Sequence, residues 1–453
     1  MKLRNTAFLI CFALIGGASF VAASLAQENK TATERAITLD EAVQLALKNN
    51  HVVRLAALRV EESRHAKDAT RSAYFPNLKN DSNAVRVTDT QFIAIPQGKL
   101  GVAAGTPIPE QTAILNQGGL TFLTSGTQLS QPIVELWKVR SANDIARAET
   151  EAMRSKAENT RNQIALQVHQ LYYKVLILQT RRAAAQAKIQ ANDDLRKERI
   201  EQVKAGSTLE QESIEARAET LAAKQELLTT ELQLSDSLVQ LNDAIGLPLT
   251  TPLVLNESVE KNRDSCEREN CLRIALESHP EIREARAEIE KASAAVRLAK
   301  REYLPSLDAF ARYTYSNDVP FLARNFGTFG IHFGYEIFDG GKRNAEIGER
   351  KSQLAQAQEN LARMKDEIEV RIQTIYNKRE RTREMMKVSE ELLALRTEVH
   401  RVANQQLQQG AALPSQVNGA AAQELYAKTA LLQSHLDYLE AEDEMLEAEG
   451  ITP

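Results

Sequence analysis

The sequence Tyr74-Phe75-Pro76-Asn77-Leu78 returns as Tyr303-Leu304-Pro305-Ser306-Leu307, 229 residues later in a chain of 453. Self-similarity at a fixed offset is typical of a duplicated supersecondary unit. We therefore expect two structural repeats, residues 27–260 and residues 261–453.

The offset between the repeats shortens further along the chain. Gly206 corresponds to Gly410 and Lys138 to Lys342, both at an offset of 204. The first repeat therefore carries 25 additional residues between about 79 and 128. The stretch rich in Gly and Pro from Ile95 to Gly119 is the place we expect for them, as a surface loop.

Each repeat begins with a predicted helix of about 35 residues, 40–74 in the first and 270–302 in the second. The Tyr-x-Pro-x-Leu motif ends each helix, because proline cannot continue it. Much longer helices are predicted at 141–204 and 345–408, each roughly 95 Å long at 1.5 Å per residue. Their apolar residues recur every three to four positions, which indicates a narrow coiled-coil seam.

Two glycines, Gly206 and Gly410, are predicted to turn the chain into a shorter return helix. The first return helix ends at Gly246-Leu247-Pro248, a glycine stop with proline beyond it. Two short helices laid end to end match one long helix in length. Aromatic residues make up only 5% of the chain, so we expect a helical shell without a thick interior.

Between its helices each repeat has two predicted strands, about 78–92 and 119–132 in the first and 306–316 and 329–337 in the second. Alternation of apolar and polar residues indicates a strand with one apolar face. This alternation is clear in the last strand, whose apolar face is predicted to hold Phe329, Ile331, Phe333, Tyr335 and Ile337.

Residues 1–26 have the form of an export signal. Lys2 and Arg4 precede an apolar run from Ala7 to Ile15, and Ser24-Leu25-Ala26 forms a cleavage site. A membrane anchor is the alternative, but the apolar run is short for a bilayer. No later run of about 18 apolar residues follows, so a lipid-spanning part would have to be a closed β-barrel.

Composition excludes other classes of function. The formal net charge of −5 argues against nucleic acid as a partner, since phosphate binding needs a basic surface. Cys266 and Cys271 could form a small-loop disulfide in an oxidising compartment or stay reduced. No second Cys or His pair stands at zinc-ligand spacing.

The sequence also lacks the marks of an enzyme. It contains no nucleophile elbow, phosphate loop or dinucleotide glycine motif. The histidines, including His51, His169, His279 and His400, are scattered, and the carboxylates follow what read as solvated helix faces. We therefore expect no catalytic residues, no metal and no cofactor.

Four strands per chain are too few to close a barrel, which needs about eight or more. Several copies would have to pool their strands, and three copies would supply twelve. The alternative is a non-channel periplasmic coiled-coil protein, structural or adaptor-like, that ends in small β-hairpins.

Several motifs stand in order along the chain. They are Thr38-Leu39-Asp40-Glu41-Ala42 through Asn49-Asn50, both Tyr-x-Pro-x-Leu segments, Gln131-Pro132-Ile133, Leu241-Asn242-Asp243-Ala244-Ile245-Gly246-Leu247-Pro248 and Ile337-Phe338-Asp339-Gly340-Gly341-Lys342. In these motifs the chain resembles the TolC family of outer-membrane efflux proteins, and the resemblance covers nearly all of the chain after residue 26.

The resemblance implies a mainly helical fold with a small β part, in a homotrimer with a twelve-stranded β-barrel in outer-membrane lipid. It also implies a periplasmic α-barrel tunnel and a passive exit duct of a tripartite pump or type I secretion system. The implied partners are a periplasmic adaptor protein and an inner-membrane transporter. The exported cargo is not readable from the sequence.

The resemblance further implies that the two hairpin tips form the periplasmic entrance and dock the adaptor. The tip residues are Gly206, Ser207, Leu209, Gly410, Ala411 and Leu413.

The entrance departs from the family pattern. In the best-known members of the family, acidic residues ring the entrance at the positions that Gln416 and Gly419 occupy here. An aromatic and a basic residue that help lock the closed state in those members are replaced here by Leu407 and Ala412. Glu212 and Glu215 occupy the equivalent positions after the first tip. They are candidates for the entrance lining, with ordinary solvated helix charges as the other interpretation.

Overall fold

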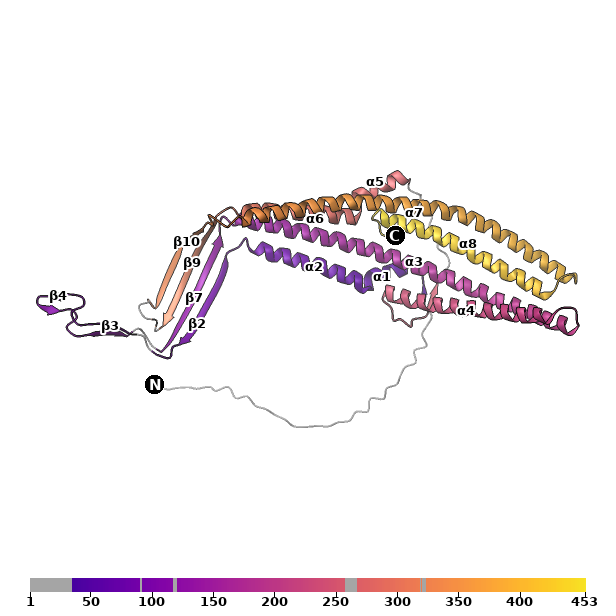
Figure 1. Ribbon diagram of the computed structural model, residues 1–453, viewed down its shortest axis with the longest axis horizontal. Helices are drawn as coiled ribbons and strands as arrows, with labels where there is room; N and C mark the ends of the chain where they lie inside the picture. The colour runs from indigo at the N-terminus through magenta and orange to yellow at the C-terminus, as the bar shows by residue number, and fades with distance from the viewer. Residues whose placement is uncertain (1–34, 90–91, 117–119, 257–266, 318, 320–322) are drawn as a thin grey trace, which may run out of the picture.

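The structure is a computed structural model, and it describes residues 35–89, 92–116, 120–256, 267–317, 319 and 323–453. The molecule is elongated, with strands at one end and two helical tips at the other (Figure 1). The expected export signal and Cys266 lie outside the described residues. Cys271 is buried in α5 (Arg268–Ser278), and the predicted disulfide stays a prediction.

Most of the chain is helical, as expected. The remaining helices are α1 (Leu39–Asn49), α2 (His51–Ser72), α3 (Leu136–Lys204), α4 (Glu210–Ile245), α6 (Pro280–Arg301), α7 (Lys342–Gln408) and α8 (Pro414–Ala448). The helices form a layer one helix thick, in the order α2-α3-α6-α7 near the strands and α4-α3-α8-α7 near the tips (Figure 1).

The two predicted helices of about 35 residues are each broken in the structure. Asn50 separates α1 from α2 and accepts the Val52 N–H on its side-chain oxygen at 2.8 Å. His279 separates α5 from α6 in the same way, and its Nδ1 accepts the Glu281 N–H at 3.1 Å. Asn50 and His279 are thus each the C-cap of one helix and the N-cap of the next, so predicting one continuous helix was wrong.

Each break receives the end of a return helix. Gly246, the C-cap of α4, has a φ of +71°, and a Cβ there would lie 2.6 Å from Asn49 Cβ. Gly450 follows α8 with a φ of +84°, and a Cβ there would lie 2.8 Å from Pro280 Cδ. Only glycine combines this backbone conformation with so close an approach.

Four long strands form one antiparallel sheet in the order β10-β9-β7-β2. They are β2 (Asn77–Arg86), β7 (Thr121–Pro132), β9 (Ser306–Asn317) and β10 (Asn325–Gly334). The last strand ends at Gly334, so Tyr335 and Ile337 lie beyond it, contrary to the predicted end at 337.

The insertion in the first repeat is not a plain loop. It folds into two small hairpins that project beyond the sheet (Figure 1). Their strands are β3 (Phe92–Ile95), β6 (Ala113–Asn116), β4 (Val102–Ala103) and β5 (Thr106–Pro107).

The helical layer, although one helix thick, buries an apolar core near its middle. Around the middle of α3, side chains from α1, α4 and α8 bury an apolar core. A short parallel pair that sequence analysis missed, β1 (Arg35–Ile37) with β8 (Leu253–Leu255), joins this core. The hydroxyl of Tyr172, which is fully buried, donates to the Ile37 carbonyl at 3.1 Å and accepts the Asn256 N–H at 2.9 Å.

Gly450→Ala should destabilise the protein by about 1–3 kcal/mol, because alanine is strained at positive φ and would collide with Pro280 and His279. Gly348→Ala is the matched control. Gly348 lies in α7 with open space around it, so alanine there should raise stability by roughly 0.5–1 kcal/mol. Thermal unfolding in detergent, followed by circular dichroism, measures both. Equal midpoints for the two variants would contradict this packing account.

Candidate functional site

The four-stranded sheet carries one apolar row across all of its strands. Leu78 pairs with Leu129, Leu129 with Ala311, and Ala311 with Phe329. Phe329 is 89% exposed, and Leu78 is 68% exposed. Exposed apolar side chains in such a contiguous arrangement mark a surface for lipid or protein contact.

The neighbouring row, on the opposite face of the sheet, is polar. Lys79 pairs with Gln128, Gln128 with Arg312, and Arg312 with Thr328. Successive residues of a strand point to opposite faces. In β10 one face is therefore apolar and the other more polar, as its alternation predicted, whereas on β2 and β7 the polar side chains of Asn80 and Thr127 share the face of Leu78 and Leu129.

A tight turn joins the sheet to the second long helix. Asp339 accepts the backbone N–H groups of Gly341 and Arg343, each at 3.0 Å, and the Arg343 Nε at 2.6 Å. These bonds, chiefly those from Arg343, lower the pKa of Asp339 to about 2. The carboxylate thus fixes the start of α7. Gly340 and Gly341, with φ of +66° and +90°, form the turn between the strand segment and the helix.

The two tips have the same backbone construction. The Gly206 N–H bonds the Val203 carbonyl, and the Ser207 N–H bonds the Gln202 carbonyl. At the second tip, Gly410 and Ala411 make the equivalent bonds to Leu407 and Gln406. This is the Schellman motif, which requires a left-handed residue at the glycine position. Gly206 has a φ of +67° and Gly410 a φ of +72°.

Both tips expose an apolar side chain immediately after the turn. Leu209 and Leu413 each precede a return helix in extended conformation, and Leu209 is 72% exposed. Gln416 accepts the Leu413 N–H on its side-chain oxygen at 3.1 Å, so this residue holds the second tip. Gly419 lies one turn further along α8 and is half-buried.

Glu212 and Glu215, the candidates for the entrance lining, are both exposed on α4. Glu212 lies 3.9 Å from Arg199 of α3, a weak surface ion pair. The structure therefore leaves the Glu212 and Glu215 carboxylates accessible from solvent at the first tip.

Polar contacts connect the two hairpins behind the tips. Glu198 of α3 accepts the backbone N–H of Ser415 at 3.1 Å and also its hydroxyl. Asn418 donates to Asp194 at 2.7 Å. The carboxylate of Glu198 is thus placed at the positive N-terminus of α8, where a negative charge is stabilising.

A second connection lies further from the tips. Glu226 of α4 accepts the Tyr426 hydroxyl and the Lys188 ammonium, both at 2.9 Å. Burial alone would raise the pKa of Glu226. The hydrogen bonds from Lys188 and Tyr426 oppose this effect, and the pKa is lowered overall. Burial, together with the Glu226 carboxylate, raises the pKa of Tyr426. One side chain from each of α3, α4 and α8 therefore meets at this point.

Sequence analysis missed a buried polar cluster. His169 of α3 lies 2.5 Å from Asp443 of α8, which also accepts the Tyr173 hydroxyl at 2.7 Å. Asp443 is 1% exposed, so placing the carboxylates on solvated faces was wrong for this residue. Asp443 lies in the acidic run Glu440-Ala441-Glu442-Asp443-Glu444, so residue type alone carried no signal that could have separated it from the half-buried carboxylates beside it.

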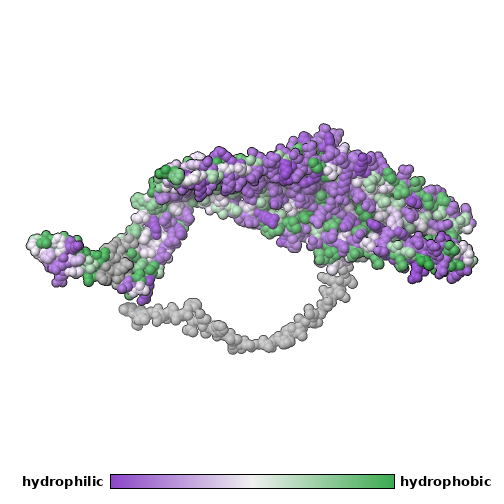
Figure 2. Space-filling view, in the orientation of Figure 1, coloured by the Kyte–Doolittle hydropathy of each residue, from purple (hydrophilic) through white to green (hydrophobic). Residues whose placement is uncertain are grey.

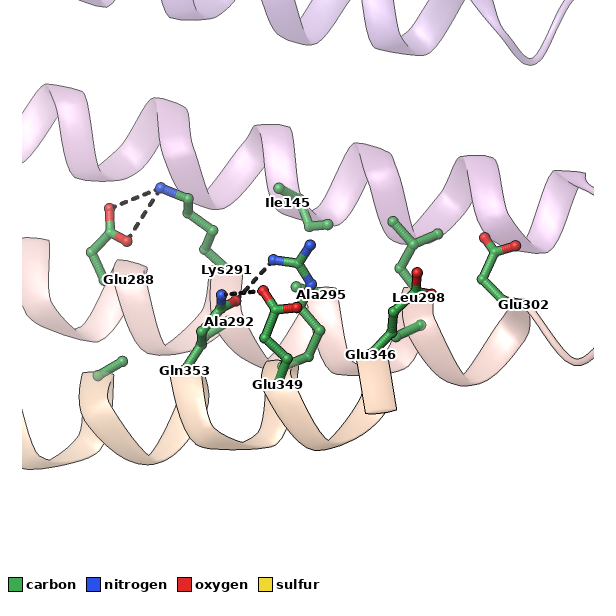
Figure 3. A pocket seen from close by; sticks show the side chains of 13 residues that line it. Ile145, Glu288, Lys291, Ala292, Ala295, Leu298, Glu302, Glu346, Glu349 and Gln353 are labelled. Atoms are coloured by element: carbon green, nitrogen blue, oxygen red, sulfur yellow. Dashed lines mark hydrogen bonds and ion pairs between the residues drawn. The ribbon is translucent and has the colours of Figure 1, made fainter. Parts of the chain in front are cut away.

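A groove of about 600 Å³ lies between α3, α6 and α7 near the strand end (Figure 3). Its floor has small side chains such as Ala292 and Ala295. Polar side chains of the groove bond one another: the Lys291 ammonium donates to Glu288 at 3.3 Å, and the neutral amide of Gln353 donates to Glu349 at 2.9 Å. Such hydrogen bonds and ion pairs are typical of the surface of packed helices and not of a catalytic site.

Other kinds of site are not found among the described residues. Within them, no group of three or more His, Cys, Asp or Glu side chains is placed to hold a metal ion. No helix in the same part of the chain is both long and apolar enough to cross a membrane.

The chain matches the family model described as "Outer membrane efflux protein" over residues 42–247 and 271–450. The protein therefore belongs to the outer membrane efflux protein family, whose members are transport channels rather than enzymes. A search of curated protein sequences gives no match. Membership of this family decides against a non-channel periplasmic coiled-coil protein.

Solved structures show the same fold. The Campylobacter jejuni CmeC outer membrane channel has a TM-score of 0.74 and 17% identity, covering 91% of this chain and 85% of that one. The Vibrio cholerae outer membrane protein VceC has a TM-score of 0.70 and 15% identity, covering 91% and 96%. The Neisseria gonorrhoeae MtrE outer membrane channel, in its open state, has a TM-score of 0.71 and 16% identity, covering 91% and 89%.

Proposed function

We propose that three copies of this chain form a passive exit channel, with twelve strands closing a β-barrel in the outer membrane and the helices forming a periplasmic tunnel. A periplasmic adaptor and an inner-membrane transporter would complete a tripartite pump or type I secretion system. The apolar row from Leu78 to Phe329, on a sheet at the end of a polar helical body, carries this proposal.

The edges of the sheet support an assembly of copies. β2 and β10 are the outer strands of the four, so each leaves one row of backbone groups without a strand partner in this sheet. Lipid offers no hydrogen bonds, so spanning strands must close into a barrel. Pairing β10 of one copy with β2 of the next would satisfy both edges, with the apolar row toward lipid and the Lys79–Thr328 row toward the lumen.

Phe329→Arg should impair membrane insertion, because arginine on the lipid face near the bilayer centre costs about 2–4 kcal/mol. Thr328→Arg, on the adjacent residue and the opposite face, should have little effect. Quantifying folded protein in outer-membrane fractions separates the two. Equal loss of both variants would show that the apolar row does not face lipid.

We also propose that the tips dock the adaptor through Leu209 and Leu413, since both side chains are exposed and lie on turns of identical construction. A Leu209→Asp/Leu413→Asp variant should fold and conduct ions yet lose export in cells. The readout is growth against a panel of drugs and metal ions in a strain lacking the gene. Leu100→Asp, on the hairpin at the far end, is the control and should keep export. Full export by the double variant would contradict docking at the tips.

For the entrance lining we propose that Glu212 and Glu215 attract cations, because both are exposed beside the first tip. In planar bilayers, Glu212→Gln/Glu215→Gln should raise the concentration of a trivalent cation needed for half-maximal block by about tenfold. Block that is unchanged would identify the two carboxylates as ordinary solvated charges.

A further inference from the structure

The end of the helical layer that meets the sheet is rich in basic residues. Four helix ends lie there: the C-terminal ends of α2 and α6 and the N-terminal ends of α3 and α7 (Figure 1). The five residues nearest each of these ends include, over the four helices, eight Lys or Arg and two Asp or Glu, a net charge of +6. The whole chain has a formal net charge of −5. Positive charge is thus concentrated next to the strands of an otherwise acidic chain.

Helix dipoles do not account for this charge. Cations stabilise the C-terminal ends of helices, and anions stabilise the N-terminal ends. The tip end of the layer also has two C-terminal ends, those of α3 and α7, and two N-terminal ends, those of α4 and α8. The same five-residue count at the tips gives one Lys or Arg and three Asp or Glu. Because both ends of the layer have the same set of dipoles, the difference in charge has another cause.

Part of the positive charge is neutralised within the chain. The segments that join these four helices to the strands add four Asp or Glu and no Lys or Arg. Two of the four acids form ion pairs: Glu302 lies 3.2 Å from Lys138, and Asp339 lies 2.6 Å from Arg343. With these acids included, cations still outnumber acids by eight to six.

Three exposed cations of this region have no ion-pair partner among the residues that the structure describes. They are Arg71 at the end of α2, Arg140 at the start of α3 and Lys300 at the end of α6. Each lies at most four residues from its helix end, which is about 6 Å at 1.5 Å per residue. The headgroup layer on each side of a bilayer is about 5–8 Å deep. If the strands span the hydrocarbon, all three cations therefore lie at headgroup depth.

Exposed aromatic and aliphatic side chains lie at the same level. Phe75, Ile337 and Phe338, in the joining segments, are 65–86% exposed. Trp137, the one tryptophan of the chain, is 55% exposed, and the Arg301 guanidinium lies 5.8 Å from the centre of its ring. Hydrophobic residues gather where the sheet meets the helices, whereas the middle of the helical body is mainly hydrophilic (Figure 2). Aromatic rings beside cations are typical of surfaces that contact the headgroups of anionic lipids.

We propose that this basic and aromatic region binds the headgroups of anionic phospholipids in the periplasmic leaflet of the outer membrane. The inference rests on the proposed function, which places the sheet in lipid and the helices in the periplasm. It adds a preference for one class of lipid, with Arg71, Arg140 and Lys300 as the main ligands. Their charged groups donate hydrogen bonds to phosphate oxygens. A zwitterionic headgroup has no net charge, so the excess of cations stabilises it less.

Quenching of Trp137 fluorescence tests this preference, because the full-length chain contains no other tryptophan. The protein is reconstituted into bilayers that mix ordinary phosphatidylcholine with phosphatidylglycerol or phosphatidylcholine brominated on the acyl chains, since bromine quenches tryptophan only at close range. Phosphatidylglycerol should bind at Trp137 with a relative constant at least about fivefold that of phosphatidylcholine. In an Arg71→Gln/Arg140→Gln/Lys300→Gln variant the ratio should fall below about twofold.

A Lys174→Gln/Lys224→Gln/Lys387→Gln variant is the matched control. It removes the same charge from three exposed lysines of α3, α4 and α7, in the half of the layer nearer the tips. This control should keep the ratio of the unsubstituted protein. Comparing the two lipids on the unsubstituted protein requires no variant, so it decides the question even if the triple glutamine variant of the basic region folds poorly.

Flotation of the same vesicles in a density gradient distinguishes this inference from the proposed function. Protein that floats with the vesicles, but is quenched equally by both lipids or by neither, would overturn the headgroup preference and leave the channel standing. A preference that survives in the Arg71→Gln/Arg140→Gln/Lys300→Gln variant would overturn the role of these three cations. Protein that does not float with vesicles would overturn the proposed function itself.

Discussion

A layer that is only one helix or one strand thick leaves both of its faces exposed, and its edge helices and edge strands lack a neighbour on one side. This constraint governs the whole molecule. Within this sheet one side of β2 and one side of β10 have no strand partner, and the helical layer leaves apolar side chains such as Leu221 of α4 and Leu395 of α7 exposed. The chain is consistent with a segment of a closed wall, in which every unsatisfied edge meets its counterpart on an identical neighbour.

Within the chain, the close contacts between the two repeats and their return helices are concentrated in the middle of the molecule, with further polar contacts behind the tips. The return helices end on the breaks at Asn50 and His279, where Gly246 and Gly450 allow close backbone approach. Tyr172 connects α3 to the β1–β8 pair, and Asp443 connects α8 to α3. Paired short helices thereby act as one column beside each long helix, which holds the tips at a fixed height relative to the sheet.

Much of this fold could be predicted from residue patterns. Alternation at Phe329, Ile331 and Phe333 identified a strand with one apolar face, and glycine at 206 and 410 identified the tips. Sequence patterns failed to predict the polar residues that form capping or buried hydrogen bonds. Asn50 and His279 look like ordinary helix residues until their capping bonds are seen, and in the sequence Asp443 is indistinguishable from the other carboxylates of the same acidic run. The positions of Leu209 and Leu413 at the tips were predictable, whereas the capping role of Gln416 depends on a turn geometry that spacing alone does not reveal.

The most direct test of a shared wall is to measure mass and conductance on the same purified preparation of the full-length protein. The account predicts a particle of three chains in mild detergent that passes ions when it is inserted into an artificial bilayer. A particle that stays a single chain and carries no current would contradict it.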